Sequence, residues 1–267
     1  MEEAWHTTTP KHSDESGGLR SVTTALDLME CFATDVELGV SDLARRLGIA
    51  KSTAHRVLST LRMRGFIEQD PESGRYRLGL HLFELGHLAR VRHPLREVAH
   101  PICSDLSRRT GLTVNLSVLD GADVVFIERL ESAERGNWLN ESGRRLPAHV
   151  SSSGKAIAAW NEEFAQARIA AGFPPRARAT VRSAGEWETM LRAVRRRGYA
   201  TSRDESYDGI SSVAVPILVH PAAVTSALSF FGRPQELDTR LPLLVQVLQR
   251  SARRIGHEMI RQQGARS

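Results

Sequence analysis

Two clusters of residues in this 267-residue chain have types and spacings suited to binding chemistry. Residues 43–64 hold six lysines and arginines and no acidic residue. Cations grouped in this way bind the phosphates of a nucleic acid. Residues 151–155, Ser-Ser-Ser-Gly-Lys, place hydroxyls at the start of a predicted helix, where backbone N–H groups without intrahelical partners can bind a carboxylate. Helix capping alone explains the same serines, so both interpretations stay open on the residues themselves.

The placement of charge is more informative than its total. The formal net charge of +5 is only a mild indication of polyanion binding. A second basic run, at 176–203, is interrupted only by Glu186 and Glu188. The composition, with 41% hydrophobic and 25% charged residues, is typical of a globular chain and excludes a mostly disordered, collagen-like or disulfide-built protein.

The sequence lacks the spacings that carry catalysis or metal binding. A phosphate-binding loop that uses Gly154 and Lys155 needs a glycine at position 149 and a serine or threonine at position 156. This chain has His149 and Ala156 there, so the motif is absent. Arg261 stands where a zinc protease helix beginning at His257 needs its second histidine. No Gly-x-Ser-x-Gly motif occurs, and the ten histidines show no ligand spacing. We therefore expect no enzymatic activity, no metal site and no cofactor.

Three short helices are predicted around the first basic cluster. Apolar residues at three- and four-residue steps predict a helix over 21–33. Gly48 ends a second helix, for which Ser41 is the expected N-cap. A third helix follows at 51–64, with apolar residues along one face and basic and hydroxyl residues along the other.

A β-hairpin is predicted after the third helix, with strands at 66–68 and 75–78. Three helices and a hairpin in this order indicate a winged helix-turn-helix, whose third helix suits the major groove of DNA. From pattern alone, a three-helix unit with a solvated charged face is the alternative. The candidate DNA-contacting residues are Ser41, Lys51, Ser52, Thr53, His55, Arg56, Ser59, Arg62, Arg75 and Arg77.

The remaining residues predict an α+β domain around an antiparallel sheet. Alternating apolar residues at 114–118 and a turn at Asp120-Gly121 predict a β-hairpin that continues over 123–130. The other elements expected are strands near 199–205, 212–219 and 224–231, and helices near 95–109, 154–171, 186–197 and 241–261.

The length favours two domains, because a domain usually contains about 100–200 residues. We expect a disordered tail over 1–18, a winged helix-turn-helix domain over 19–79, a linker helix over 80–93 and an effector-binding domain over 94–263. The sequence shows no secretory signal and no apolar stretch of the roughly 18 residues that cross a bilayer. Two cysteines without metal or disulfide spacing, expected to be buried and reduced, favour the cytoplasm.

Several motifs together resemble those of IclR-type bacterial transcription regulators. They follow one another in the family's order from about residue 19 to the last helix. The segments that carry the resemblance are 43–61, 65–66, 76–79, 146–149, 152–156 and 209–216. Two positions depart from the pattern, since Thr24 stands where many members have arginine and Ser212 where many have cysteine. The resemblance implies a winged helix-turn-helix followed by a GAF-like effector-binding domain, assembled as dimers or tetramers.

The resemblance also implies an effector site at the Ser152-Ser153 segment. A small organic acid, aliphatic or aromatic, is expected to place its carboxylate on the backbone N–H groups of these two serines. For the neighbouring Asp204 and Glu205, a solvated turn is the alternative. The candidate effector-binding residues are Leu130, Trp138, Leu146, His149, Ser152, Ser153, Ser202, Asp204, Glu205, Ser212 and Ser229.

Together these observations predict a ligand-responsive regulator, a repressor or an activator of a catabolic operon. Its expected partners are a palindromic double-stranded DNA operator, a small organic acid and further copies of the chain, with no membrane. The alternative is an enzyme or a metabolite-binding carrier in which the basic helix is incidental.

Overall fold

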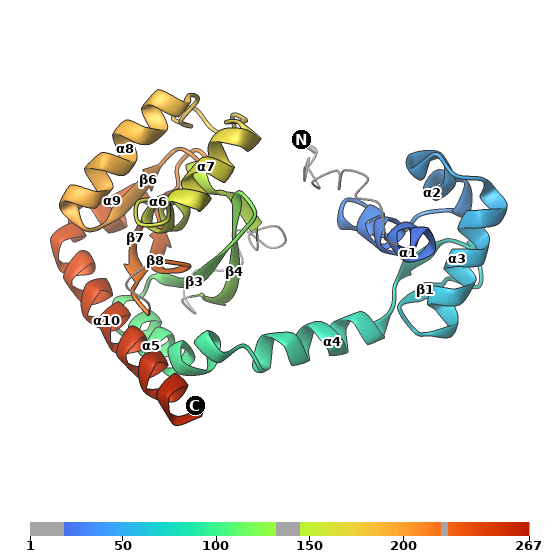
Figure 1. Cartoon of the computed structure of the whole chain (residues 1–267), viewed down its shortest axis with the longest axis horizontal. Helices are drawn as coiled ribbons and strands as arrows, with labels where there is room; N and C mark the ends of the chain where they lie inside the picture. Colours follow the sequence, from blue (N-terminus) through green and yellow to red (C-terminus); the bar gives the residue numbers. More distant parts are fainter. Residues whose placement is uncertain (1–18, 132–144, 220–223, 267) are drawn as a thin grey trace. The chain divides into compact units, whose positions relative to one another are not determined.

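The computed structural model of the chain describes residues 19–131, 145–219 and 224–266 (Figure 1). It divides into two compact units, Met1–Ala89 and Arg90–Ser267. The division falls inside helix α4 (Leu80–Val91), in the segment expected as a linker. The expected tail over 1–18 lies outside the described residues.

The first unit is a winged helix-turn-helix, as predicted. Its elements are α1 (Arg20–Glu30), α2 (Val40–Leu47), α3 (Lys51–Met63), β1 (Ile67–Gln69) and β2 (Tyr76–Leu78). The two strands pair antiparallel and form the wing. Burial of one apolar face of each helix provides the stabilising free energy. The fully or nearly fully buried residues include Leu28, Leu43, Leu58, Ile67 and Tyr76.

The prediction that Ser41 caps the second helix is wrong. Helix α2 begins one residue earlier, at Val40, and its N-cap is Gly39. The carbonyl of Gly39 accepts the first hydrogen bonds, from the N–H groups of Asp42 and Leu43 at 3.1 Å each. Ser41 therefore lies in the first turn, where its side chain is exposed.

The second unit is built on an antiparallel sheet, which confirms the predicted α+β class. In the described residues the sheet has six strands in the order β5-β4-β3-β8-β7-β6. Strand β3 lies between β4 and β8 in this order, so its side chains reach the centre of both faces. The strands are β3 (Thr113–Asp120), β4 (Asp123–Leu130), β5 (Arg145–Pro147), β6 (Ala200–Arg203), β7 (Ser211–Ile217) and β8 (Ser226–Gly232).

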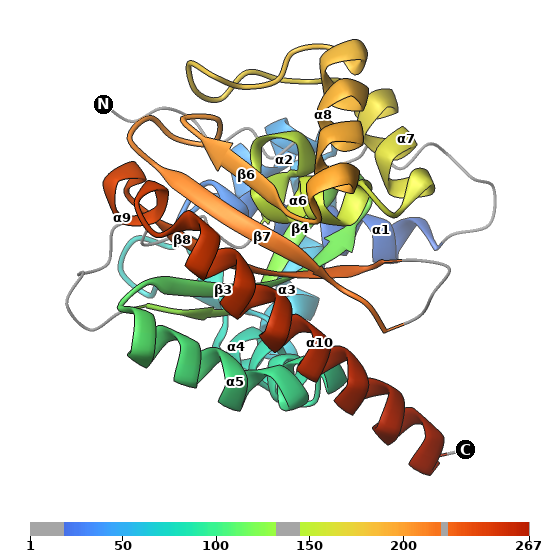
Figure 2. The ribbon, with the colours of Figure 1, turned by 90° about the vertical axis from the view of Figure 1, so that its left-hand side faces the viewer.

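Helices cover both faces of this sheet (Figure 2). Helices α5 (Pro94–Thr110) and α10 (Leu241–Arg266) pack on one face against apolar side chains of β3, β7 and β8. Helices α6 (Ser152–Ala158), α7 (Glu162–Ala171) and α8 (Ala184–Arg197) pack with the small residues of the other face, such as Ala200, Ala214 and Ala227. A short helix, α9 (Pro234–Asp238), precedes α10.

Some local features differ from the sequence-based expectations. The helical segment expected near 154–171 is two helices, because Asn161 accepts a hydrogen bond from the Phe164 N–H and caps a new helix. Strand β5 and helix α9 were not expected. Cys103 is buried as expected, but Cys31 is only partly buried.

The packing of α6 against the preceding residues leaves no room for a side chain at Gly154. A Cβ atom there would lie 2.3 Å from the Ala148 carbonyl oxygen and 2.4 Å from its Cα. We expect Gly154→Ala to lower the free energy of unfolding by about 1–3 kcal/mol or more, as overpacking does. Urea unfolding followed by tryptophan fluorescence measures this change.

The control is Gly185→Ala in α8, where nothing lies within 4 Å of an added Cβ. It should leave stability unchanged or raise it by up to about 1 kcal/mol, because alanine restricts the unfolded chain and favours helix. Equal stability of both variants would show that α6 is free to move away from residue 148.

Candidate functional site

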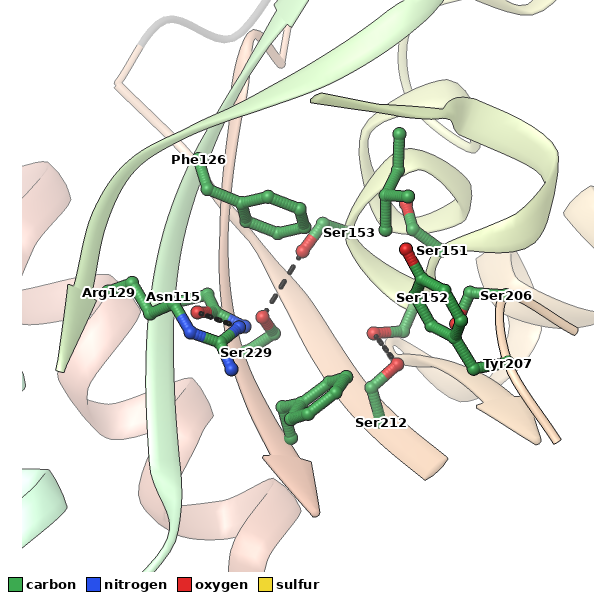
Figure 3. A pocket seen from close by; sticks show the side chains of 12 residues that line it. Asn115, Phe126, Arg129, Ser151, Ser152, Ser153, Ser206, Tyr207, Ser212 and Ser229 are labelled. Atoms are coloured by element: carbon green, nitrogen blue, oxygen red, sulfur yellow. Dashed lines mark hydrogen bonds between the residues drawn. The ribbon is translucent and has the colours of Figure 1, made fainter. Parts of the chain in front are cut away.

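A pocket lies between the sheet and the start of α6 (Figure 3). Six of its lining residues are serines, whose hydroxyls can both donate and accept hydrogen bonds. Arg129 is the one charged residue among the described residues that line it. The lining consists of Asn115, Phe126, Arg129, Leu146, Ser151, Ser152, Ser153, Ser206, Tyr207, Ser212, Ser229 and Phe231.

Serine hydroxyls connect the start of α6 to three strands. The hydroxyl of Ser152 donates to that of Ser212 on β7 at 2.7 Å. The hydroxyl of Ser117 on β3 donates to Ser153 at 3.0 Å, and Ser153 donates to Ser229 on β8 at 3.2 Å. Because all these side chains except that of Ser212 are almost fully buried, each hydroxyl needs a partner inside the protein. A bound polar ligand would exchange these bonds for its own.

The first turn of α6 adds backbone donors to this end of the pocket. The N-cap Ser151 accepts the N–H of Gly154 through its hydroxyl at 2.9 Å. The N–H groups of Ser152 and Ser153 belong to the first turn, which has no intrahelical acceptors for them. Hydroxyl and amide donors are therefore concentrated where α6 begins.

A β-bulge in β4 decides which of its side chains face the pocket. The register runs Asn115 opposite Arg129, Leu116 opposite Glu128 and then Ser117 opposite Phe126. The residue between Phe126 and Glu128 is thus an extra one on this strand. As a result, Phe126 and Arg129 both point to the pocket face, although they are three residues apart in a strand (Figure 3).

Glu128 points to the opposite face of the sheet, where it is 3% exposed. Its carboxylate accepts Arg96 Nη2 at 2.7 Å and contacts His100 Nδ1 at 2.8 Å. Arg90, near the end of α4, lies 3.6 Å away. Strand β4 is thereby joined to α5 and to the last turn of α4 by one buried carboxylate.

A loop between β6 and β7 supplies Ser206 and Tyr207 to the pocket. It is held by an ion pair between the buried Lys155 and Glu205, and by a hydrogen bond from Thr180 Oγ1 to the Glu205 carbonyl at 2.8 Å. Burial lowers the pKa of Lys155 and raises that of Glu205, and the attraction between the two opposes both shifts. Arg178 pairs with Asp204 in the same loop.

The cavity itself is small. Its volume of about 20 Å³ gives room for one water molecule. An organic acid therefore fits only when lining side chains move apart. Movement of the large lining side chains, those of Phe126, Arg129 and Tyr207, would open the most space.

The structure brings some of the expected effector residues together and not others. Leu146, Ser152, Ser153, Ser212 and Ser229 line the pocket. Trp138 lies outside the described residues.

The other five lie elsewhere in the second unit. Leu130 packs against the apolar cluster beneath α5 and α10. The hydroxyl of Ser202 donates to the Val150 carbonyl at 2.9 Å, and Asp204 and Glu205 hold the loop described above. His149 is fully buried beside Phe173.

Sequence reasoning missed seven lining residues: Asn115, Phe126, Arg129, Ser151, Ser206, Tyr207 and Phe231. Ser206 and Tyr207 directly follow Glu205, so their proximity to the expected site was a usable signal. Strand alternation offers no such signal for Arg129, because the bulge shifts the faces of β4.

The first unit exposes most of the residues expected to contact DNA. On α3, Lys51, Ser52, Thr53, His55, Arg56 and Arg62 are exposed, and Ser59 is half-buried. Within the described residues Lys51 and Arg56 form no ion pair. The wing arginines differ, since Arg77 pairs with Glu68 at 3.2 Å and Arg75 donates to the Glu37 carbonyl at 3.0 Å.

Part of the second basic run is paired with acidic side chains. Arg178 pairs with Asp204, Arg195 lies 3.4 Å from Glu162, and Arg203 lies 2.8 Å from Asp238. With Arg192, which lies 3.9 Å from Glu188, four of the eight arginines of this run have an acidic partner among the described residues.

Two other kinds of site are not found in the described residues. In that part of the chain, no cluster of three or more His, Cys, Asp or Glu side chains is arranged to hold a metal ion. Across 19–131, 145–219 and 224–266, no helix combines the length and apolar character needed to span a membrane.

Comparison with known families identifies both units. Residues 21–71 match the family model of the IclR helix-turn-helix domain, and residues 87–257 match that of the bacterial transcriptional regulator IclR C-terminal domain. The HTH-type transcriptional regulator XynR of Escherichia coli (strain K12) is 36% identical over 226 residues, covering 82% of this chain and 88% of XynR. A glycerol operon regulatory protein of Streptomyces coelicolor is 34% identical over 228 residues, covering 83% and 89%.

Solved structures show the same architecture. An IclR transcriptional regulator from Alicyclobacillus acidocaldarius superposes with a TM-score of 0.79 at 26% identity, covering 90% of this chain and 99% of that one. An IclR homolog from Microbacterium hydrocarbonoxydans, complexed with 4-hydroxybenzoate, gives a TM-score of 0.76 at 28% identity, with the same coverage.

Burial of His149 makes the stability of the second unit depend on pH. Its Nε2 donates to the Pro174 carbonyl at 3.0 Å, and among the described residues its buried Nδ1 has no partner. Burial lowers the pKa of His149 from 6.5 to about 4. The unfolded chain therefore binds this proton at a higher pH than the folded protein does, so stability falls as the pH drops from 6.5 towards 4.

We expect this one residue to contribute at most about 3 kcal/mol to the loss. Unfolding measured at several pH values in this interval should give a shallower decline for His149→Gln than for the unmodified chain. An identical pH dependence in the two proteins would mean that His149 titrates normally.

Proposed function

The chain belongs to the IclR family of bacterial transcriptional regulators, and from this premise we propose that it senses a small organic acid and controls a catabolic operon. As a family member it is a DNA-binding transcription regulator. The relatives that it matches over most of their length are named as regulators. The alternative of an enzyme or carrier with an incidental basic helix is therefore set aside. The serine-rich pocket with its single arginine is the observation that carries the proposal.

The two units have separate roles in this proposal. Residues 19–79 bind the operator, the helix over 80–93 links the units, and residues 94–263 bind the effector. The exposed cations of α3, which lack acidic partners in the described residues, support its placement in the major groove. The wing arginines Arg75 and Arg77 are exposed, which supports phosphate contacts, and Arg77 would exchange its pair with Glu68 for a phosphate.

The effector is a small carboxylate that the hydroxyls and first-turn N–H groups of Ser152 and Ser153 bind. One observation on a relative supports this choice, since a solved homolog is complexed with 4-hydroxybenzoate, an aromatic acid. A second relative is named for the glycerol operon, which supports a catabolic target and not the acid. Ser212, whose hydroxyl already accepts from Ser152, adds a partner for a hydroxyl substituent on the acid.

Self-association as a dimer or tetramer, on a palindromic operator, is part of the proposal. Helix α4 buries none of its residues within the chain, although it is rich in leucine. Phe83 is 71% exposed and Leu80 is 64% exposed. Apolar side chains left in water on one helix favour contact with another copy. A dimer also covers enough base pairs to select one site in a genome.

The first test replaces Arg56 on the exposed face of α3 with alanine. If Arg56 contacts a guanine, affinity for the DNA upstream of the chain's own gene should fall by about 1–3 kcal/mol. Thermal unfolding should barely change, because the side chain is exposed. Gel shifts with competitor DNA at fixed salt measure the affinity.

Arg108→Ala is the matched control, since Arg108 is an exposed arginine of the second unit. It should bind the operator like the unmodified chain. Wild-type affinity of Arg56→Ala would remove Arg56 from the contact surface.

Sedimentation of the same preparations tests self-association, and a monomer at micromolar concentration would contradict it.

The second test compares two substitutions of Ser153. Alanine removes the hydroxyl that contacts Ser117 and Ser229, whereas proline, which the first turn of a helix tolerates, also removes the N–H. If the amide binds a carboxylate, proline should weaken binding about tenfold or more beyond alanine. Calorimetry with lactate, succinate, gluconate, benzoate and 4-hydroxybenzoate provides the measurement.

The outcomes of this test distinguish acid sensing by the chain from the position of the carboxylate on the Ser153 amide. If none of these acids binds the unmodified chain, acid sensing is wrong as proposed. If an acid binds both variants equally well, the chain senses acids, but the carboxylate does not lie on the Ser153 amide.

A further inference from the structure

We propose that Arg129 selects an effector with a second acidic group, which makes a dicarboxylic acid the preferred ligand class. This inference rests on the proposed function and names the substrate class of that same pocket. One carboxylate would lie at the start of α6 and the other on the guanidinium of Arg129.

The placement of Arg129 is the first support. In Figure 3, Arg129 and Asn115 lie on one side of the pocket, and Ser152, Ser212 and Tyr207 lie on the other. The bulge in β4 turns Arg129 to this face together with its register partner Asn115. The pocket therefore has a cationic end and a hydroxyl end.

The side chain of Arg129 is held within the pocket wall. Its guanidinium carbon lies 5.0 Å from the ring centroid of Phe231, a cation–π contact. Nη1 lies 3.5 Å from Asn115 Oδ1, and Nε donates to Glu131 at 2.8 Å. A guanidinium carries five N–H donors, so these described contacts leave the Nη2 edge with donors for a further acceptor.

Each end of the pocket carries hydrogen-bond donors and therefore favours an acceptor group of the ligand. Arginine only donates, and first-turn amides only donate, while carboxylates only accept. A monocarboxylate would fill one end and leave the partly buried Nη2 edge of Arg129 at the other end without a ligand acceptor. Such unmet donors make a site discriminate strongly against the shorter ligand.

Glu131 competes with the second carboxylate for Arg129. It occupies the Nε edge and offsets part of the guanidinium's charge. Removing the charge of Glu131 should therefore strengthen dicarboxylate binding, whereas removing that of Arg129 should abolish the preference. If the Arg129–Glu131 ion pair were only structural, the two substitutions would not change the dicarboxylate preference in opposite directions.

The experiment uses the full-length protein and calorimetry with matched pairs of probes. Succinate is compared with succinamate, glutarate with glutaramate, and terephthalate with its monoamide, because each pair differs in one charge. The variants are Arg129→Gln, Arg129→Lys and Glu131→Gln, with Arg108→Gln as the control. Circular dichroism and unfolding temperature confirm that each variant is folded.

The unmodified chain and Arg108→Gln should prefer at least one diacid over its half-amide by about 10- to 100-fold. Arg129→Gln should bind both members of that pair equally, and Arg129→Lys should keep part of the preference because it lacks the bidentate geometry. Glu131→Gln should increase the preference.

Two results would overturn the inference while leaving acid sensing intact. One is a preference for the half-amide, or no preference, in the unmodified chain; the other is an unchanged preference in Arg129→Gln. If none of these probes and none of the monocarboxylates binds, the proposed function itself fails.

Discussion

The complete burial of α6 is the constraint on which the second unit depends. Every residue of this helix is buried, including Ser152, Ser153 and Lys155. A buried hydroxyl or ammonium group is costly unless it is hydrogen-bonded or paired. The serines therefore bond to β7 and β8, and Lys155 pairs with Glu205. These contacts place the β6–β7 loop against the pocket, and Gly154 allows the helix to lie on residue 148.

Strand β4 connects the pocket with the start of the second unit. Its bulge sends Phe126 and Arg129 to one face and Glu128 to the other. Glu128 holds Arg96 and His100 on α5 and lies near Arg90 at the end of α4. A single strand thus contacts both the candidate effector site and the helix that leads to the other unit. A ligand alters DNA affinity only if it binds two conformers differently, and β4 is an element that both regions share.

The partners of the charged residues distinguish the two basic runs. Arginines at 178, 195 and 203 have acidic partners within the second unit. On α3, Lys51 and Arg56 are exposed and have no ion pair within the described residues. The unpaired cations of α3 are therefore suited to a polyanion, whereas acidic partners offset part of the second run.

Local patterns in the sequence determined the winged helix, the outward face of α3 and the serines at the start of α6. Each depends on residues within one or two turns, so periodicity and capping preferences suffice to predict it. The tertiary structure alone decided the role of Arg129, because a bulge arises from pairing with β3 and reverses the alternation of β4. It also decided that Leu130 packs beneath α5 and α10. Contacts between segments distant in sequence select among local options that are nearly equal in free energy, and no local pattern records that choice.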